Sequence, residues 1–220
     1  MAGIGFNPGH LGTPQENDCR SCHSGLFERQ FIHAVMEDEC VNCHTPVNPI
    51  HPQDGVKGFT LAERIPDLCY LCHETKNVLK RVHYPVEEGE CLACHNAHGS
   101  DHSSLLIASF PEAYYVPGTP DRYELCFLCH DSDLLVLEKT SSVTNFRNGE
   151  QNLHHLHLTG DRGRSCLLCH GAHATGNPHL ILTEVPWGGW TMKMNFTRTE
   201  TGGSCFPGCH GELSYSRTLP

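Results

Sequence analysis

Hydrophobic residues in this chain come in short runs, and no run keeps one period for long. Apolar side chains recur at intervals of three and four over 26–36, 61–82 and 125–139, which predicts modest helices there. The stretches 46–58, 111–120 and 178–195 are broken by Pro and Gly, so we expect extended or turn structure in them. No apolar run approaches the roughly 18 residues that a membrane span requires, so we expect no span.

The composition limits how large an apolar core the chain can build. Hydrophobic residues make up 38% of the sequence, and 21 Gly and 14 Pro are spread over 220 residues. Such a chain cannot bury enough apolar side-chain surface on its own for a large core. Something other than side chains is therefore expected to fill the interior.

The cysteines indicate what fills it, because all 14 belong to seven motifs that end in histidine. Six motifs read Cys-x-x-Cys-His and the last has one extra residue: Cys19, Cys22 and His23; Cys40, Cys43 and His44; Cys69, Cys72 and His73; Cys91, Cys94 and His95; Cys126, Cys129 and His130; Cys166, Cys169 and His170; Cys205, Cys209 and His210. In such a motif two thiols bind the vinyl groups of one porphyrin, and the histidine becomes an axial ligand of the iron. We therefore predict seven haem c groups.

Other uses of paired cysteines fit less well. A zinc site, half an iron–sulfur site, a redox pair or a disulfide framework would leave the recurring histidine unexplained. For the longer motif at Cys205 and Cys209, a disulfide or a zinc pair stays open as an alternative.

The haem density sets the expected fold class. We expect a multihaem cytochrome c with little regular secondary structure, in which short α-helices and loops wrap around a stacked haem chain. The repeat of motifs predicts one heptahaem domain over 1–220. Alternating short and long spacings group the haems as pairs at about 10–58, 59–110 and 111–180, with a lone C-terminal haem at 181–220. Trp187 and Trp190 flank Gly188-Gly189, and we favour their packing on a porphyrin over a short hairpin.

The other axial ligands are expected to be histidines, since eleven histidines lie outside the motifs while the chain has only 4 Met. The haem potentials should then be low. Histidines precede motifs by seven to nine residues, and His98 and His173 follow a motif histidine too closely to share its iron. Candidates for the second ligand are His33, His51, His83, His98, His154, His157 and His173, with His10 as the strongest substitute. His102, His155 and His179 are expected to bind no iron.

Two segments carry a resemblance to a known family. The segment 69–100, with Val-His-Tyr-Pro-Val and Cys-Leu-Ala-Cys-His-Asn-Ala-His, and the segment 126–175 resemble the doubled Cys-x-x-Cys-His unit of multihaem c-type cytochromes. The resemblance implies electron transfer, and a second-ligand role for His83, His98 and His173. We expect no enzymatic reaction, because an iron with two histidines has no open position for a substrate. His154 and His157 match the family's Asn-Leu-His-x-x-His element. Val47 departs from the pattern, so one early haem needs a ligand such as His51, His10 or a residue of another subunit.

Charge and attachment chemistry limit the location and the partners. The formal net charge is −10, which argues against nucleic acid and favours redox protein partners or extracellular electron acceptors. Haem c is attached outside the cytoplasm, so we expect an exported protein, periplasmic or at the cell surface. The leading hypothesis is an electron conduit, one form being a homopolymeric filament. The alternatives are a haem subunit of a membrane quinol or quinone complex and a reductase with one open haem.

Overall fold

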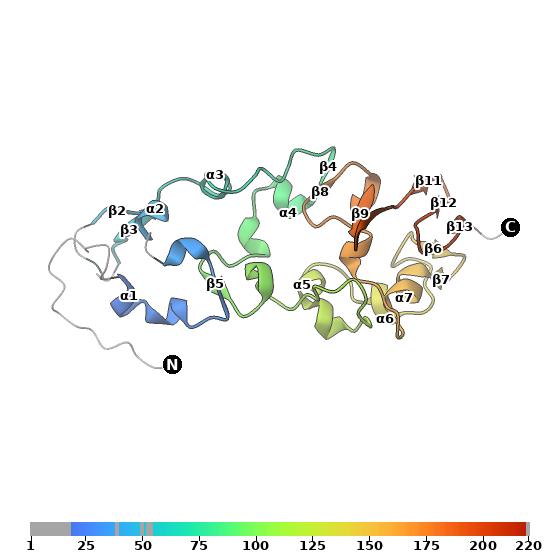
Figure 1. Cartoon of the computed structure of the whole chain (residues 1–220), viewed down its shortest axis with the longest axis horizontal. Coiled ribbons are helices and arrows are strands. Elements are labelled where there is room, and N and C mark those ends of the chain that lie inside the picture. The colour runs from blue at the N-terminus through green and yellow to red at the C-terminus, as the bar shows by residue number, and fades with distance from the viewer. Residues whose placement is uncertain (1–18, 38–39, 49–50, 52–54, 219–220) are drawn as a thin grey trace. The chain divides into compact units, whose positions relative to one another are not determined.

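The computed structural model describes residues 19–37, 40–48, 51 and 55–218, and its regular elements are short (Figure 1). The α-helices are α1 Cys19–Cys22, α2 Cys40–Cys43, α3 Asp67–Tyr70, α4 Tyr84–Glu87, α5 Glu124–Phe127, α6 Asp133–Val136 and α7 Leu153–Leu158. Single 3-10 turns lie at Ser24–Phe27, Ala34–Met36, Cys91–Ala93, Ser103–Leu105, Pro120–Tyr123, Cys166–Leu168 and Pro178–Leu180.

The strands are equally brief. They are β1 Phe31–Ile32, β2 His44–Pro46, β3 Phe59–Leu61, β4 Arg81–Val82, β5 Gly99–Ser100, β6 Arg147–Asn148, β7 Gln151–Asn152, β8 Ala174–Thr175, β9 Glu184–Trp187, β10 Trp190–Lys193, β11 Thr197–Arg198, β12 Gly202–Cys205 and β13 Leu213–Ser216. All pairings in these sheets are antiparallel. The expectation of short helices and loops is met, whereas haem stacking stays a prediction.

The helices expected over 26–36, 61–82 and 125–139 do not form as continuous elements, and that expectation was wrong. Remote strands take up the backbone hydrogen bonds: β1 pairs with β5, and β4 pairs with β8. In the third stretch α5 ends before the motif histidine His130, and α6 begins afresh where the Asp131 carboxylate accepts from Asp133 N–H. A recurrence of apolar residues at three and four was therefore not sufficient to predict a continuous helix in these stretches.

Two compact units divide the chain. Unit 1 comprises 1–74 and 89–107, and unit 2 comprises 75–88 and 108–220. In unit 1 the β1–β5 and β2–β3 ladders are the sheets of the described residues. Met36 is the one buried hydrophobic side chain among the described residues of that unit.

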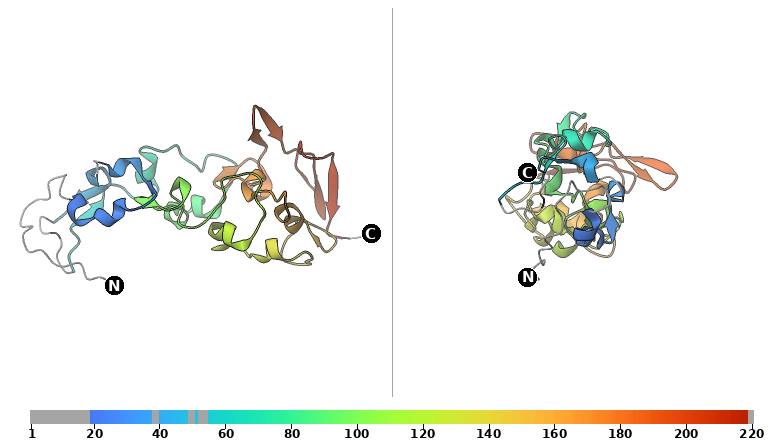
Figure 2. Two further views of the ribbon diagram at one scale, coloured as in Figure 1. Left: turned by 60° about the horizontal axis from the view of Figure 1, so that its bottom comes forward. Right: turned by 90° about the vertical axis from the view of Figure 1, so that its left-hand side faces the viewer.

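Unit 2 has two small apolar clusters. One joins Leu168, Val185, Met192 and Met194, and the other joins Tyr123, Leu135 and Leu158. The first holds the β9–β10 hairpin, which stands out from the rest of unit 2 (Figure 2). The hairpin forms where sequence analysis favoured packing on a porphyrin. Gly188, at φ +57°, occupies the left-handed conformation that its turn requires.

Only ten hydrophobic side chains are buried in the described part of the chain. The polypeptide exposes 14779 Å², whereas a folded monomer of this mass is expected to expose about 10,000 Å². Within the described ranges, no helix has the length and apolar character needed to cross a bilayer. The chain alone therefore lacks the interior that would hold it together.

Candidate haem-binding sites

Each regular motif is wound into a single turn. The N–H of the motif histidine donates to the carbonyl of the first cysteine, at 2.9 Å in His23, His73, His130 and His170 and 3.1 Å in His95. The turn brings the two thiols and the histidine to one side of the chain. This arrangement suits attachment of one porphyrin through both sulfurs.

The longer seventh motif is built differently. Cys205 ends strand β12, and the Cys209 thiol lies 3.7 Å from the Met192 sulfur. A Cβ added at Gly208 would come within 2.9 Å of the Trp190 ring on β10. The glycine therefore lets the hairpin approach the loop. All 14 cysteines lie in the described part of the chain, and each is free of a disulfide.

Five motif histidines each face a histidine from outside the motifs. The ring centroids are 5.9–6.3 Å apart and the ring planes differ by 16–22°. The pairs are His23 with His51, His44 with His98, His73 with His33, His130 with His83, and His170 with His154.

The separation fits two imidazoles on one metal ion. Two metal–nitrogen bonds of about 2 Å, with each ring centroid about 1 Å behind its nitrogen, place the centroids about 6 Å apart. Ordinary aromatic neighbours also reach this separation. The same distance and near-parallel planes recur five times, and each time they join one motif histidine to one outside the motifs.

Two other candidate second ligands, His157 and His173, are not among these five ring pairs. For His157 the structure gives a lowered pKa, caused first by burial and then by the charges of Arg164 and His210. The backbone N–H of His83 donates to the carbonyl of His173, as that of His33 donates to the carbonyl of His98. His173 thus holds in unit 2 the place that His98 holds in unit 1. His10 lies outside the described residues.

In four of the candidate second ligands Nδ1 lies beside a carbonyl or a hydroxyl, which leaves Nε2 for a metal. Nδ1 of His33 and His83 lies 2.8 and 3.0 Å from the carbonyls of Ala97 and Ala172. Nδ1 of His157 lies 2.6 Å from the Leu153 carbonyl. His154 differs, because its Nδ1 meets a hydroxyl, Thr144 Oγ1, at 3.0 Å.

Two motif histidines are oriented by the same kind of turn. His95 Nδ1 lies 2.9 Å from the Ser104 carbonyl, and His170 Nδ1 lies 2.9 Å from the His179 carbonyl. Each carbonyl belongs to a pair of left-handed residues, with φ of 54° and 57° in one turn and 56° in both residues of the other. Such a conformation is costly for residues other than glycine. It points the carbonyl back at the imidazole.

The three histidines expected to bind no iron have other contacts. His155 Nδ1 lies 2.8 Å from the Leu135 carbonyl, on a neighbouring helix. His179 contributes its backbone carbonyl to His170. The backbone N–H of His102 donates to Ser100 Oγ at 2.9 Å.

Burial keeps several of these rings neutral. It lowers the pKa of His154 to about 4, with His170 and then His157 adding to the effect. Burial also lowers the pKa of His98, His130, His157 and His170. An imidazole must be neutral to bind a metal, so these rings are ready to do so near neutral pH.

Sulfurs of successive motifs lie beside one another within each unit. Burial and then Cys91 raise the pKa of Cys69 in unit 1. A hydrogen bond with Cys126 raises the pKa of Cys166 in unit 2. Burial, followed by Cys205 and Cys209, raises the pKa of Cys169 to about 11. Groups attached to neighbouring motifs would therefore approach closely.

The chain fits haem in a further respect, which concerns exposed apolar side chains. Leu71, Leu92, Leu128, Leu167 and Phe206 all lie between the cysteines of a motif, and each is at least 36% exposed. Unit 1, with four motifs, has almost no apolar core of its own. Porphyrin rings would provide the apolar surface that both units lack.

Comparison with known proteins identifies the class. The segments 33–78 and 83–134, just under half of the chain, match the model of the doubled CXXCH motif. The match supports a multihaem c-type cytochrome, and CXXCH motifs indicate covalently bound haem c. No curated protein matches the sequence significantly.

The matched segments pair the second motif with the third and the fourth with the fifth, whereas the motif spacing paired the first with the second and the third with the fourth. Each segment begins at a histidine outside the motifs, His33 or His83, and then contains two motifs. In each segment this first histidine faces the histidine of the second motif, His73 or His130. The repeating unit defined by these matches is therefore one leading histidine followed by two motifs.

Proposed function

We propose that this chain carries seven haem c groups and acts as an electron conduit outside the cytoplasm, with two histidines on every iron. The observation that carries the proposal is the set of five near-identical histidine pairs, each with one motif histidine. Haem, when bound, supplies an iron that exchanges single electrons. The proposed second ligands are His33, His51, His83, His98, His154, His157 and His173.

The protein's own groups support a carrier rather than an enzyme. Hydrogen bonds to Nδ1 fix which ring nitrogen faces the metal and raise its basicity, which lowers the potential. Two histidines on an iron leave no position for a substrate. Adjacent sulfurs of successive motifs support short distances between neighbouring redox groups within each unit.

Haem c attachment requires export, and we propose a periplasmic or cell-surface location with redox proteins or extracellular acceptors as partners. Filament assembly through a histidine of another subunit is one form of the proposal. Electron microscopy of the purified protein separates filaments from single particles.

The test is carbon monoxide titration of the reduced protein, together with EPR of the oxidised protein and its intact mass. We expect a mass increase of seven haems, low-spin signals throughout and no carbon monoxide bound. A high-spin haem that binds carbon monoxide in the native protein would contradict the proposal and indicate an open iron. Replacement of His102, which faces no motif histidine in the described structure, should leave all three results unchanged.

A further inference from the structure

Asn152 is a polar side chain with no exposed surface, at the end of β7 and immediately before helix α7. Its Oδ1 accepts from the backbone N–H of His154 at 3.0 Å and of His155 at 3.3 Å. Its Nδ2 donates to the carbonyls of Leu137 at 2.7 Å and Leu134 at 3.0 Å, with Asp133 at 3.5 Å. One side chain thus satisfies donors on one helix and acceptors on another.

The helix that Asn152 caps carries two of the proposed iron ligands. Helix α7 has six residues, too few to be stable alone, so its direction depends on how it begins and what it packs against. His154 faces the motif histidine His170, and the rings of His154 and His157 both pack against Phe146. Residues three apart share one side of a helix. A shift of α7 would therefore displace both ligands together.

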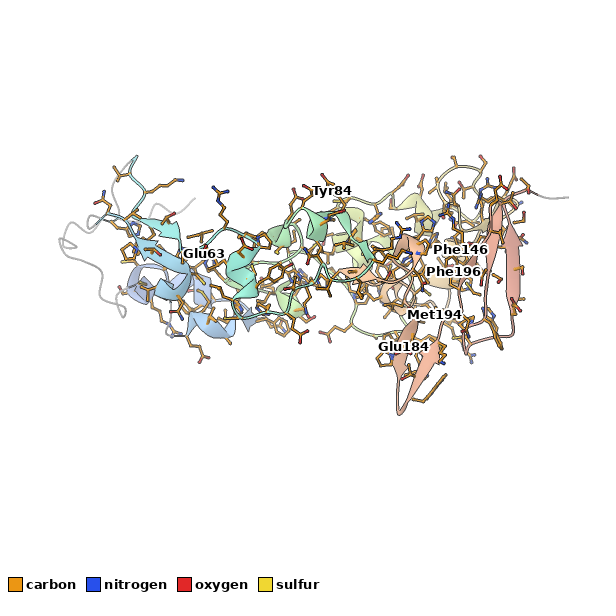
Figure 3. All side chains as sticks on the ribbon, turned by 90° about the horizontal axis from the view of Figure 1, so that it is seen from above. Glu63, Tyr84, Phe146, Glu184, Met194 and Phe196 are labelled. Atoms are coloured by element: carbon orange, nitrogen blue, oxygen red, sulfur yellow. The ribbon has the colours of Figure 1, made fainter. Side chains whose placement is uncertain are left out.

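Helix α6 is the element to which Asn152 attaches the start of helix α7. The last carbonyls of a helix need partners from outside it, and Asn152 donates to those of Leu134 and Leu137. Helices α6 and α7 lie against each other (Figure 1). The ring of Phe146, labelled in Figure 3, packs against the imidazoles of both proposed ligands on helix α7. Its centroid lies 5.2 Å from that of His154 and 5.6 Å from that of His157.

We propose that Asn152 is the positioning residue that orients both proposed iron ligands of helix α7, His154 and His157, at once. The inference rests on the proposed bis-histidine ligation. It goes further by making two redox centres depend on one buried amide that touches neither ring.

Asn96 offers a matched comparison in unit 1. Its Oδ1 accepts from the backbone N–H of His98 at 3.0 Å and of Gly99 at 3.5 Å, the same two-residue offset as in Asn152 and His154. Asn96 is exposed, and one proposed ligand follows it. Its loss can free at most one iron, whereas the loss of Asn152 should free two.

The experiment compares Asn152→Ala, Asn152→Ser and Asn96→Ala with the native holoprotein, first confirming an unchanged haem mass in each. We expect carbon monoxide binding to rise from none to about two per chain in Asn152→Ala, with a matching high-spin EPR signal. Asn96→Ala should bind at most one. Asn152→Ser keeps an acceptor for the His154 N–H, so it should restore low-spin ligation in part.

The outcomes distinguish a failure of bis-histidine ligation from a failure of the role proposed for Asn152. Carbon monoxide binding by the native protein would contradict bis-histidine ligation itself. A native protein inert to carbon monoxide together with an inert Asn152→Ala would overturn the role of Asn152 alone. Binding spread over many haems in both Asn152 variants would also overturn it, because the residue would then support the fold in general.

Discussion

Replacing Thr144 by Val should raise the reduction potential of one haem, the one at the sixth motif. Thr144 Oγ1 lies 3.0 Å from His154 Nδ1 and accepts the N–H of Phe146 at 3.0 Å. With Nε2 on the iron, Nδ1 carries the proton and donates it to the hydroxyl. That donation increases the basicity of the imidazole and stabilises the oxidised iron. Valine keeps the shape of the side chain and removes the acceptor.

The size of the shift follows from the strength of one hydrogen bond. A net contribution of about 0.5–1.5 kcal/mol, lost mainly from the oxidised state, corresponds to a rise of about 20–65 mV at 59 mV per factor of ten. The burial of His154 supports the upper part of this range, because a buried hydrogen bond is less screened by water. The other haems should keep their potentials.

Spectroelectrochemical titration measures the change, with one-seventh of the absorbance amplitude expected to move to higher potential. Thr140→Val is the matched control, since Thr140 is also 8% exposed and its Oγ1 accepts from Ser142 and Val143 rather than meeting a histidine. An unchanged or lowered potential in Thr144→Val would refute the reasoning. An equal rise of the potential in Thr140→Val would also refute it, because the loss of a hydroxyl that binds only backbone N–H groups would then be enough to cause the shift.

Two further variants test the core and the ligand set. Tyr123 is fully buried against Leu135 and Leu158, so Tyr123→Ala should destabilise the holoprotein by about 3–5 kcal/mol in denaturant unfolding. Tyr123→Phe should cost less, about 0.5–1.5 kcal/mol, because it removes only the hydroxyl with its contacts to the Arg164 carbonyl and to Ser165. Equal losses in the two variants would contradict the packing argument. His98→Ala should create one carbon monoxide site per chain, and none should appear in His102→Ala.

The cysteine motifs made the class of protein predictable from sequence, because their chemistry fixes the spacing of two thiols and a histidine. The choice of His33, His51, His83, His98 and His154 among the other histidines also agrees with the pairs that the structure brings together. Their role as ligands stays a prediction. The number of histidines outside the motifs and their distance from each motif along the chain were the features that allowed this choice.

Local pattern could not predict which histidine faces which motif. His33 meets His73 and His44 meets His98, across strands whose pairing joins residues far apart in sequence. The carbonyls that hold the rings were also missed, since a backbone atom has no sequence signature. An Asn two residues before His98 and before His154 was the one available signal. The modest helices expected over 26–36 and 61–82 failed for a related reason, as part of each stretch pairs with a remote strand.

The order of these pairs along the chain has a consequence for how the protein is made. Synthesis runs from the N-terminus, so His33, His83 and His154 already exist when the motifs that they face appear. His98 follows His44 only after two more motifs have been made. Under the proposed ligation, an iron attached at the second motif would wait with an open position, exposed to capture by a wrong histidine. Maturation of unit 1 is the step at which misligation traps should accumulate.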